Sequence, residues 1–158
     1  MRALNIFEQA HVVNALPAID ITGGKLTDVW SMKYFRGANI LISIGVSAAA
    51  FTKILLFACD DFAGTNPVAL PFKIYKCETA LDDRFGANVD VTAAGYTPTA
   101  NDNTMYGIYV DAQALASLGK ECMYVQLTNG ANSVIAQVDV ILTGTRFGGP
   151  NNGVTAIA

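Results

Sequence analysis

Charged residues and histidine are scarce in this chain. Of its 158 residues, 15% are charged, 52% are hydrophobic, and the one histidine is His11. Soluble domains usually carry about 25% charged residues, which coat the surface that faces water. A chain this poor in charge has too little polar material to face solvent on every side. We therefore expect its surplus apolar surface to contact other protein.

No hydrophobic run is long enough to cross a membrane. The longest mostly apolar stretch, residues 38–56, is interrupted by serine, glycine and lysine, whereas a bilayer span needs about 20 mainly apolar residues. Near the N-terminus the single basic Arg2 is followed by the acidic Glu8, a pattern that makes a poor signal peptide. We therefore expect a chain that is made in a cytoplasm and has no membrane partner.

Residues for catalysis and cofactor binding are sparse. Any Ser–His or Cys–His pair has to use His11, and neither a G-x-S-x-G elbow nor a phosphate-binding glycine loop is present. Cys59, Cys77 and Cys122 are odd in number and widely spaced, which favours buried free thiols over a zinc or redox site. The sequence therefore predicts no enzyme and no cofactor.

Charge patterning gives little support to ion or nucleic-acid binding. The net charge is −3 and no basic run is present, so we expect no nucleic-acid partner. Acidic and amide residues gather at 60–61, 82–83 and 101–103. Such residues could bind calcium through oxygen, but they also populate β-turns for reasons of backbone geometry. The turn interpretation is preferred, so no metal site is predicted.

Short β-type segments separated by turn residues make up most of the chain. The predicted strands are 26–32, 38–47, 52–59, 72–78, 87–93, 105–111, 121–128 and 133–145. Their number and spacing favour an all-β, single-domain antiparallel β-sandwich or jelly roll of about eight strands with extended termini. The predicted divisions are an N-terminal arm (1–18), a β-sandwich domain (19–147) and a C-terminal tail (148–158).

Three local patterns refine this prediction. Apolar residues alternate along 123–128 and 133–142 on either side of an Asn-Gly loop, which predicts a hairpin. The strand at 53–59 is apolar on both faces, so it is either covered by a loop or in contact with a neighbouring subunit. A short helix is expected over 112–118, capped by Asp111 and ended by Gly119.

The N-terminal arm and one aromatic segment are the candidate contact regions. Residues 1–18 carry large apolar side chains outside any clear strand, and they either fray or become ordered on a neighbour. Residues 34–36 are Tyr, Phe and Arg, followed by a glycine. These three residue types are enriched at protein interfaces. The candidate interface residues are Ile6, Phe7, His11, Val12, Val13, Tyr34, Phe35 and Arg36.

Four segments, at 13–21, 43–50, 99–103 and 144–147, resemble small structural proteins of tailed bacteriophages, including the jelly-roll decoration (cement) proteins of phage heads. The resemblance implies a non-enzymatic virion protein on the capsid exterior, synthesised in the host cytoplasm. Its implied partners are the major capsid protein, whose subunits it bridges, and further copies of itself, as a trimer first and a dimer second. It assigns no individual contact residues.

Two other functions remain open from the sequence. A phage tail receptor- or glycan-binding module can share the same β-sandwich fold, since fold does not determine function. Such a module presents exposed aromatic residues beside Asp or Asn loops. A small hydrolase is less favoured, because His11 is the one histidine available and it lies in the predicted arm.

Overall fold

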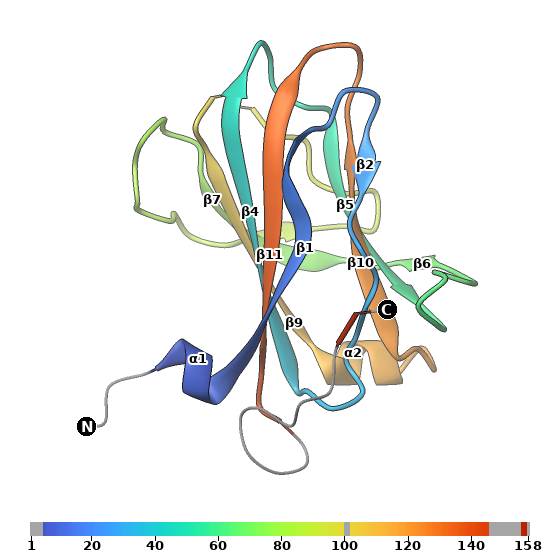
Figure 1. The fold of residues 1–158 in the computed structure, drawn as a ribbon. Helices are drawn as coiled ribbons and strands as arrows, with labels where there is room; N and C mark the ends of the chain where they lie inside the picture. Colours follow the sequence, from blue (N-terminus) through green and yellow to red (C-terminus); the bar gives the residue numbers. More distant parts are fainter. Residues whose placement is uncertain (1–4, 100–101, 146–155, 158) are drawn as a thin grey trace.

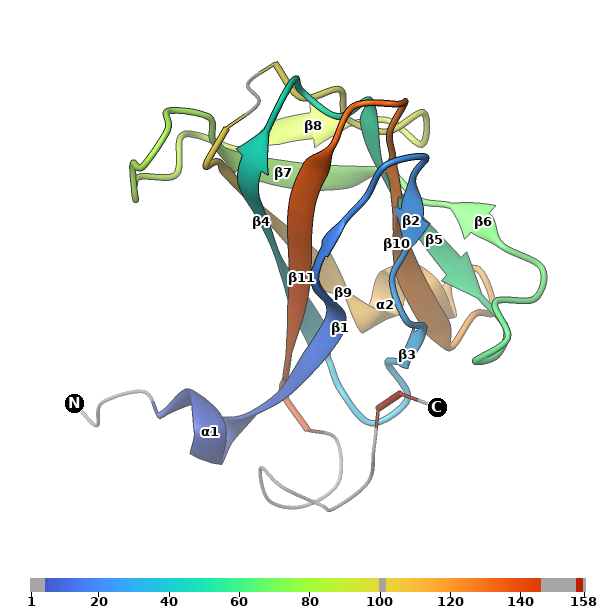
Figure 2. The same cartoon turned by 45° about the horizontal axis from the view of Figure 1, so that its top comes forward.

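The chain folds as a two-layer β-sandwich (Figure 1). The computed structural model describes residues 5–99, 102–145 and 156–157. Over these residues the strands form two antiparallel sheets, and Figure 2 shows the sheets facing each other across a common core. The predicted all-β sandwich is confirmed.

The larger sheet has six strands in the part of the chain that is described. Their order is β1 (Ala10–Asp20), β11 (Val134–Thr143), β4 (Gly37–Ser47), β9 (Met105–Asp111), β7 (Phe72–Cys77) and β8 (Val89–Val91). Along β4, Ile40, Ile42 and Ile44 are buried while Asn39 is exposed. The alternation follows from the two-residue period of a strand, which gives this sheet an inner core face and an outer face.

The second sheet and two short helices complete the sandwich. The described part of this sheet has the order β2 (Lys25–Leu26), β10 (Cys122–Thr128), β5 (Lys53–Cys59) and β6 (Val68–Ala69), with β3 (Trp30–Ser31) also paired to β10. Helix α1 (Ile6–Gln9) precedes β1, and α2 (Ala112–Ala116) connects β9 to β10. Helix α2 confirms the predicted short helix and its cap: Asp111 accepts a hydrogen bond from Gln113 N at 2.8 Å.

Successive strands pass between the two sheets. The path runs from β1 to β2 and β3 in the opposite sheet, back to β4, and then across to β5; this is the double-sheet path of a jelly roll. The last two strands are separated in the same way, since β10 pairs with β5 and β11 pairs with β4 and β1. The predicted hairpin is therefore wrong, although both of its strands are present.

The predicted arm also differs from the structure. Residues 10–20 form β1, which pairs with β11 from Ala10 to Asp20 and buries Val13, Ala15 and Leu16. The boundary expected at residue 18 is therefore corrected: β1 belongs to the sandwich as an edge strand. Of the predicted tail, residues 148–155 and 158 lie outside the described residues, whereas Ile157 forms a bridge with Trp30 of β3.

The strand with two apolar faces, β5, pairs along its edge with the loop at 95–96. Tyr96 pairs with β5 through two backbone hydrogen bonds of 2.8 and 2.9 Å, and Gly95 lies against the Leu55 side chain. The Phe57 ring stacks on Tyr124 with ring centroids 5.2 Å apart. The outward Leu55 and Phe57 side chains stay half-buried, and contact of this face with a neighbouring subunit stays a prediction.

Candidate docking face

The outer face of the six-stranded sheet carries much apolar surface. In an antiparallel sheet, directly paired residues project to the same side, and the register places residues of β1, β11, β4, β9 and β7 together on this face. Its large apolar side chains are 37–48% exposed: Val12, Tyr75, Phe85, Tyr109 and Ile135. Such a gathering marks an interaction surface more often than isolated exposed residues do.

A hollow lies at the centre of this face because Gly107 has no side chain. Gly107 of β9 is paired with Leu41 of β4 on one side and with Tyr75 of β7 on the other. The hollow has a volume of about 360 Å³, and its walls include Ile141 and Phe85. A Cβ atom at Gly107 would lie 3.6 Å from Phe85 Cε1 and 3.8 Å from Tyr75 Cβ, which are ordinary van der Waals distances.

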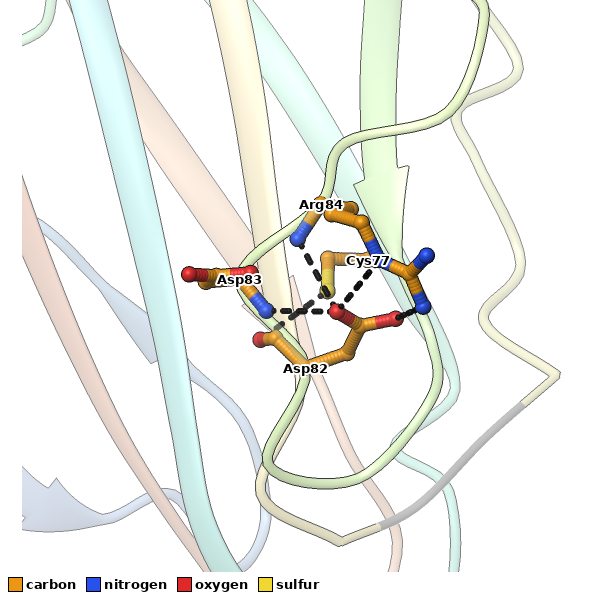
Figure 3. Close-up of polar contacts among 4 residues, drawn as sticks. All are labelled: Cys77, Asp82, Asp83 and Arg84. Carbon is orange, nitrogen blue, oxygen red and sulfur yellow. Dashed lines mark hydrogen bonds and ion pairs between the residues drawn. The ribbon is translucent and has the colours of Figure 1, made fainter.

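Phe85 is held beside the hollow by a hydrogen-bonded loop between β7 and β8. Figure 3 shows the Asp82 carboxylate, which accepts hydrogen bonds from the backbone N–H groups of Asp83 (2.8 Å) and Arg84 (3.2 Å). Its second oxygen forms an ion pair with Arg84 Nη2 at 3.0 Å. Cys77 Sγ donates to Asp82 O at 3.2 Å. The hydrogen bond from the Arg84 guanidinium lowers the pKa of Asp82, so these contacts persist to more acidic pH than those of an unperturbed aspartate.

The aromatic side chain of Tyr109 lies next to the hollow and comes from the same strand. Tyr109, 48% exposed, lies two residues after Gly107 and is paired with Asn39 of β4. A Cβ atom at Gly37 would lie 2.7 Å from Tyr109 Oη, so the ring rests on the Gly37 backbone. Because Gly37 is paired with Asp111, the ring leans away from Gly107. The hollow therefore stays open, and the Tyr109 ring lies beside it over β4.

The charged groups on this face have partners. Lys73 Nζ lies 3.1 Å from Asp90 Oδ1, and both side chains are largely exposed. Asp139 Oδ2 accepts a hydrogen bond from Gln137 Nε2 at 2.7 Å. The hydroxyl of Tyr75 accepts from Asn88 Nδ2 at 3.4 Å. With these charged side chains paired to neighbours, the face is suited to contact another protein mainly through apolar surface.

A second apolar surface lies at the α1 end of the sandwich. Both views show α1 set apart from the body of the sandwich (Figures 1 and 2), and no residue of α1 is buried. Phe7 is 78% exposed and Ile6 is 37% exposed. The His11 ring lies 5.7 Å from the Phe35 ring, centroid to centroid, so the structure brings the start of β1 and the 34–36 segment together as candidate contact regions.

Two of the eight predicted interface residues belong to the core. Val13 is 4% exposed and Phe35 is 3% exposed. Val13 is paired with the buried Val140 and so projects between the sheets, whereas Val12 is paired with Ile141 on the outer face. The aromatic residues of the 34–36 segment predicted a protein-contact region, but the Phe35 side chain packs in the core. Tyr34 is half-buried and Arg36 is exposed.

Groups for chemistry are dispersed in the part of the chain that is described. There, no three His, Cys, Asp or Glu side chains are placed to hold a metal ion. The three cysteines are buried free thiols, as predicted, and burial raises the pKa of Cys59 to about 11. None of the described helices is long and apolar enough to cross a bilayer.

Sequence reasoning missed the hollow. Its centre is a glycine inside a strand, which in a sequence suggests only a bulge or a close backbone approach. The neighbours Leu41 and Tyr75 come from strands far apart in the sequence, and Phe85 comes from a loop. The available signal was the alternation along β9, in which Gly107 and Tyr109 lie between the apolar positions Tyr106, Ile108 and Val110.

Comparison with known proteins gives a structural likeness to a phage-related protein. No protein-family model matches this sequence, and no curated protein matches it. The chain is similar to the SPBc2 prophage-derived protein YomS, known from a crystal structure. The match covers 90% of this chain and 100% of that chain, with 15% sequence identity and a TM-score of 0.47.

Proposed function

We propose that this chain is a non-enzymatic structural protein of a tailed-phage particle. In this proposal it binds the outside of the capsid and stabilises the shell by bridging major capsid subunits. The sequence segments that resemble phage decoration proteins support the proposal. So does the low charge content, which favours a surface that contacts protein over one that faces water on every side.

The observation that carries the proposal is the presence of two separate apolar surfaces on one small sandwich. A protein that bridges neighbours needs a contact surface for each of them. The outer face around Gly107 offers one such surface, and the α1 end with Phe7 offers the other. We assign the α1 end to the capsid, because a short helix without buried residues can settle on a large surface without disturbing the sandwich.

Binding to empty shells tests the proposal directly. The purified full chain is incubated with expanded empty shells of a tailed phage and then sedimented, with the shell-bound fraction measured against concentration. We expect saturable binding and a higher melting temperature of the decorated shells. A chain that stays in the supernatant at about 10 µM, roughly the weak end of specific protein–protein contacts, contradicts the proposal.

A matched pair of variants tests the assignment to the α1 end. Phe7→Ser removes a side chain that is 78% exposed, and Leu26→Ser removes one that is 56% exposed on the opposite sheet. Both substitutions leave the core intact. We expect Phe7→Ser to weaken shell binding about tenfold or more and Leu26→Ser to leave it unchanged. Equal effects of the two substitutions would contradict the assignment.

A glycan-binding tail module is the alternative, and one observation favours it. Three aromatic side chains, Tyr75, Phe85 and Tyr109, line the hollow, and sugar rings stack on aromatic faces. However, the one polar side chain of the lining other than the tyrosine hydroxyls is that of Asn39, so few groups are present to bond sugar hydroxyls. A glycan array that gives binding, together with no binding to shells, would establish this alternative.

A further inference from the structure

We infer that Cys59 and Cys122 form an intramolecular disulfide when this chain meets a peroxide outside a reducing compartment. The two thiols lie on neighbouring strands, β5 and β10, which run side by side in Figure 2. The bond uses residues of this chain alone, so the inference goes beyond the function proposed above and does not depend on it. It rests on the strand register, on the burial of the pair and on a pocket that reaches one of the two thiols.

The register makes Cys59 and Cys122 direct cross-strand partners. Directly paired residues of an antiparallel ladder have Cα atoms about 4.5–5.5 Å apart, within the ~4.4–6.8 Å that a disulfide spans. Their side chains also project to the same side of the sheet. The next pair on that side shows this closeness directly, because the Phe57 and Tyr124 rings stack with centroids 5.2 Å apart. The two strands therefore already hold the thiols at the separation that a disulfide needs.

The third cysteine has a different neighbour. All three cysteines are free and buried. Cys77 ends β7 in the six-stranded sheet, where its cross-strand partner is Met105. Its Sγ atom donates a hydrogen bond to Asp82 O at 3.2 Å. The fold therefore selects one pair among the three thiols and leaves Cys77 as an internal control.

A pocket gives a small oxidant access to Cys122. The pocket has a volume of about 360 Å³, and Ser31, Phe62 and Cys122 are among its lining residues. Cys122 is 4% exposed, whereas Cys59 is 0% exposed. Hydrogen peroxide is small enough to enter such a pocket. We therefore expect oxidation to begin at Cys122 and to reach Cys59 only through it.

The chemistry takes two steps. The Cys122 thiolate attacks one oxygen of hydrogen peroxide, the O–O bond breaks, and a sulfenic acid forms while the released hydroxide takes up the thiol proton as water. The Cys59 thiolate then attacks the sulfenic sulfur, the S–S bond forms as the S–O bond breaks, and a second water carries away the Cys59 proton. Two thiols are oxidised and one peroxide is reduced to two waters. Burial raises the pKa of both thiols, which keeps the thiolate fraction low and the reaction slow.

The loop after β5 can accept the new bond. In the reduced protein Cys59 Sγ donates to Asp61 O at 3.5 Å, and this hydrogen bond is lost on oxidation. The Asp61 carboxylate still accepts hydrogen bonds from the backbone N–H groups of Ala63 (3.0 Å) and Thr65 (3.1 Å). The loop therefore keeps its own hydrogen bonds when the thiol proton is removed.

The disulfide should make the sandwich harder to unfold. It closes a loop of roughly 60 residues, which contains β7, β8 and β9 and then returns to the smaller sheet at β10. A crosslink of this length restricts the unfolded chain much more than the folded one. We therefore expect the oxidised protein to melt about 5–15 °C above the reduced protein.

Peptide mapping of the oxidised full chain tests the pairing. The native chain, purified in a reductant that is then removed, is incubated with millimolar hydrogen peroxide, denatured, alkylated and digested with trypsin. Trypsin cuts after Lys and Arg, so the three cysteines fall in separate peptides. We expect mass spectrometry to find Cys59 joined to Cys122, with Cys77 alkylated and the intact mass lower by two hydrogen atoms. The same dose applied to the chain in urea shows that the peroxide suffices to oxidise the thiols.

Alanine variants separate the roles of the three cysteines. Cys77→Ala is the matched control, and we expect it to form the disulfide and to gain the same melting temperature as the wild type. Cys59→Ala should form no disulfide and gain no melting temperature, and its Cys122 should be oxidised further, to the sulfinic acid. Cys122→Ala should leave Cys59 unoxidised in the native protein, because Cys59 is 0% exposed.

Three results would overturn the inference. The first is a native wild-type chain that keeps its thiols, or that stops at a sulfinic acid on Cys122, at a peroxide dose that oxidises the chain in urea. The second is a disulfide that includes Cys77 or that joins two chains. The third is a Cys59–Cys122 bond that leaves the melting temperature unchanged or lowers it. The wild-type mapping uses no substitution, so the test stands even where an alanine variant fails to fold.

Discussion

Glu78 joins three parts of the sandwich through one half-buried carboxylate, and its substitution gives a sharp test of the energetics. Its Oε1 atom accepts hydrogen bonds from the hydroxyls of Tyr96 (2.9 Å) and Tyr106 (3.1 Å) and from Thr99 N (3.0 Å). Its Oε2 atom accepts from Thr99 Oγ1 at 2.8 Å and lies 3.3 Å from Lys76 Nζ. The Glu78 side chain is 14% exposed.

The pKa of Glu78 sets the expected magnitude. Burial by itself raises this pKa, but the hydrogen bonds from Thr99, Tyr96 and Tyr106 outweigh burial and lower the pKa from 4.5 to about 2. At 1.36 kcal/mol per unit, the ionised carboxylate stabilises the fold by roughly 3 kcal/mol at neutral pH. Because the folded-state pKa is the lower one, this stabilisation is present above pH ~4.5 and is lost as the pH falls toward ~2.

Urea unfolding of Glu78→Gln measures this contribution. We expect the free energy of unfolding to fall by about 2–3 kcal/mol at pH 7, with the difference from the wild type shrinking between pH ~4.5 and ~2. As a control, Asp90→Asn removes an exposed ion pair with Lys73 and should change stability by less than about 1 kcal/mol. A Glu78→Gln effect below about 1 kcal/mol at pH 7, or one that is equal at pH 2.5 and pH 7, would refute the reasoning.

Three further predictions follow from the backbone, the thiols and the N-terminus. Gly95→Ala should destabilise the fold by about 2 kcal/mol or more in urea unfolding, because Gly95 has φ +85° and an added Cβ would lie 2.5 Å from Ile54 O. Gly119 has a similar φ of +69°, but open space surrounds it, so Gly119→Ala should cost only about 1 kcal/mol. The buried thiol of Cys59, whose pKa is raised to about 11, should react with a disulfide reagent at pH 8 only after unfolding; rapid reaction of the native protein would contradict its burial. Deletion of residues 1–9 should leave the cooperative thermal transition within a few degrees of the wild type, since α1 has no buried residue; loss of that transition would show that α1 supports the sandwich.

Much of the fold could be predicted because its signals are local. Alternating apolar residues identify β4, β10 and β11, and the Asp111 cap with Gly119 identifies α2. Pairing is a long-range property. The 129–133 connection suits a tight hairpin as well as a passage between sheets, and alternation shows which face of a strand is apolar without naming the neighbouring strand.

Strand β1 was missed because its alternation is broken. Its register with β11 shifts between Asn14 and Leu16 and again between Leu16 and Ile19, and Pro17 lies within it. Bulges and proline are typical of an edge strand, but in a sequence they look like an irregular arm. The docking face was missed for a related reason: the hollow at Gly107 exists only through cross-strand register and the placement of the Phe85 loop.

Electron cryomicroscopy of decorated shells tests the central claim most directly, namely that this sandwich joins proteins on the outside of a phage capsid. We expect density for the sandwich above the shell, with the α1 end toward the major capsid subunits. Shells without added density after incubation with the full chain, or density found only at a tail, would contradict the claim.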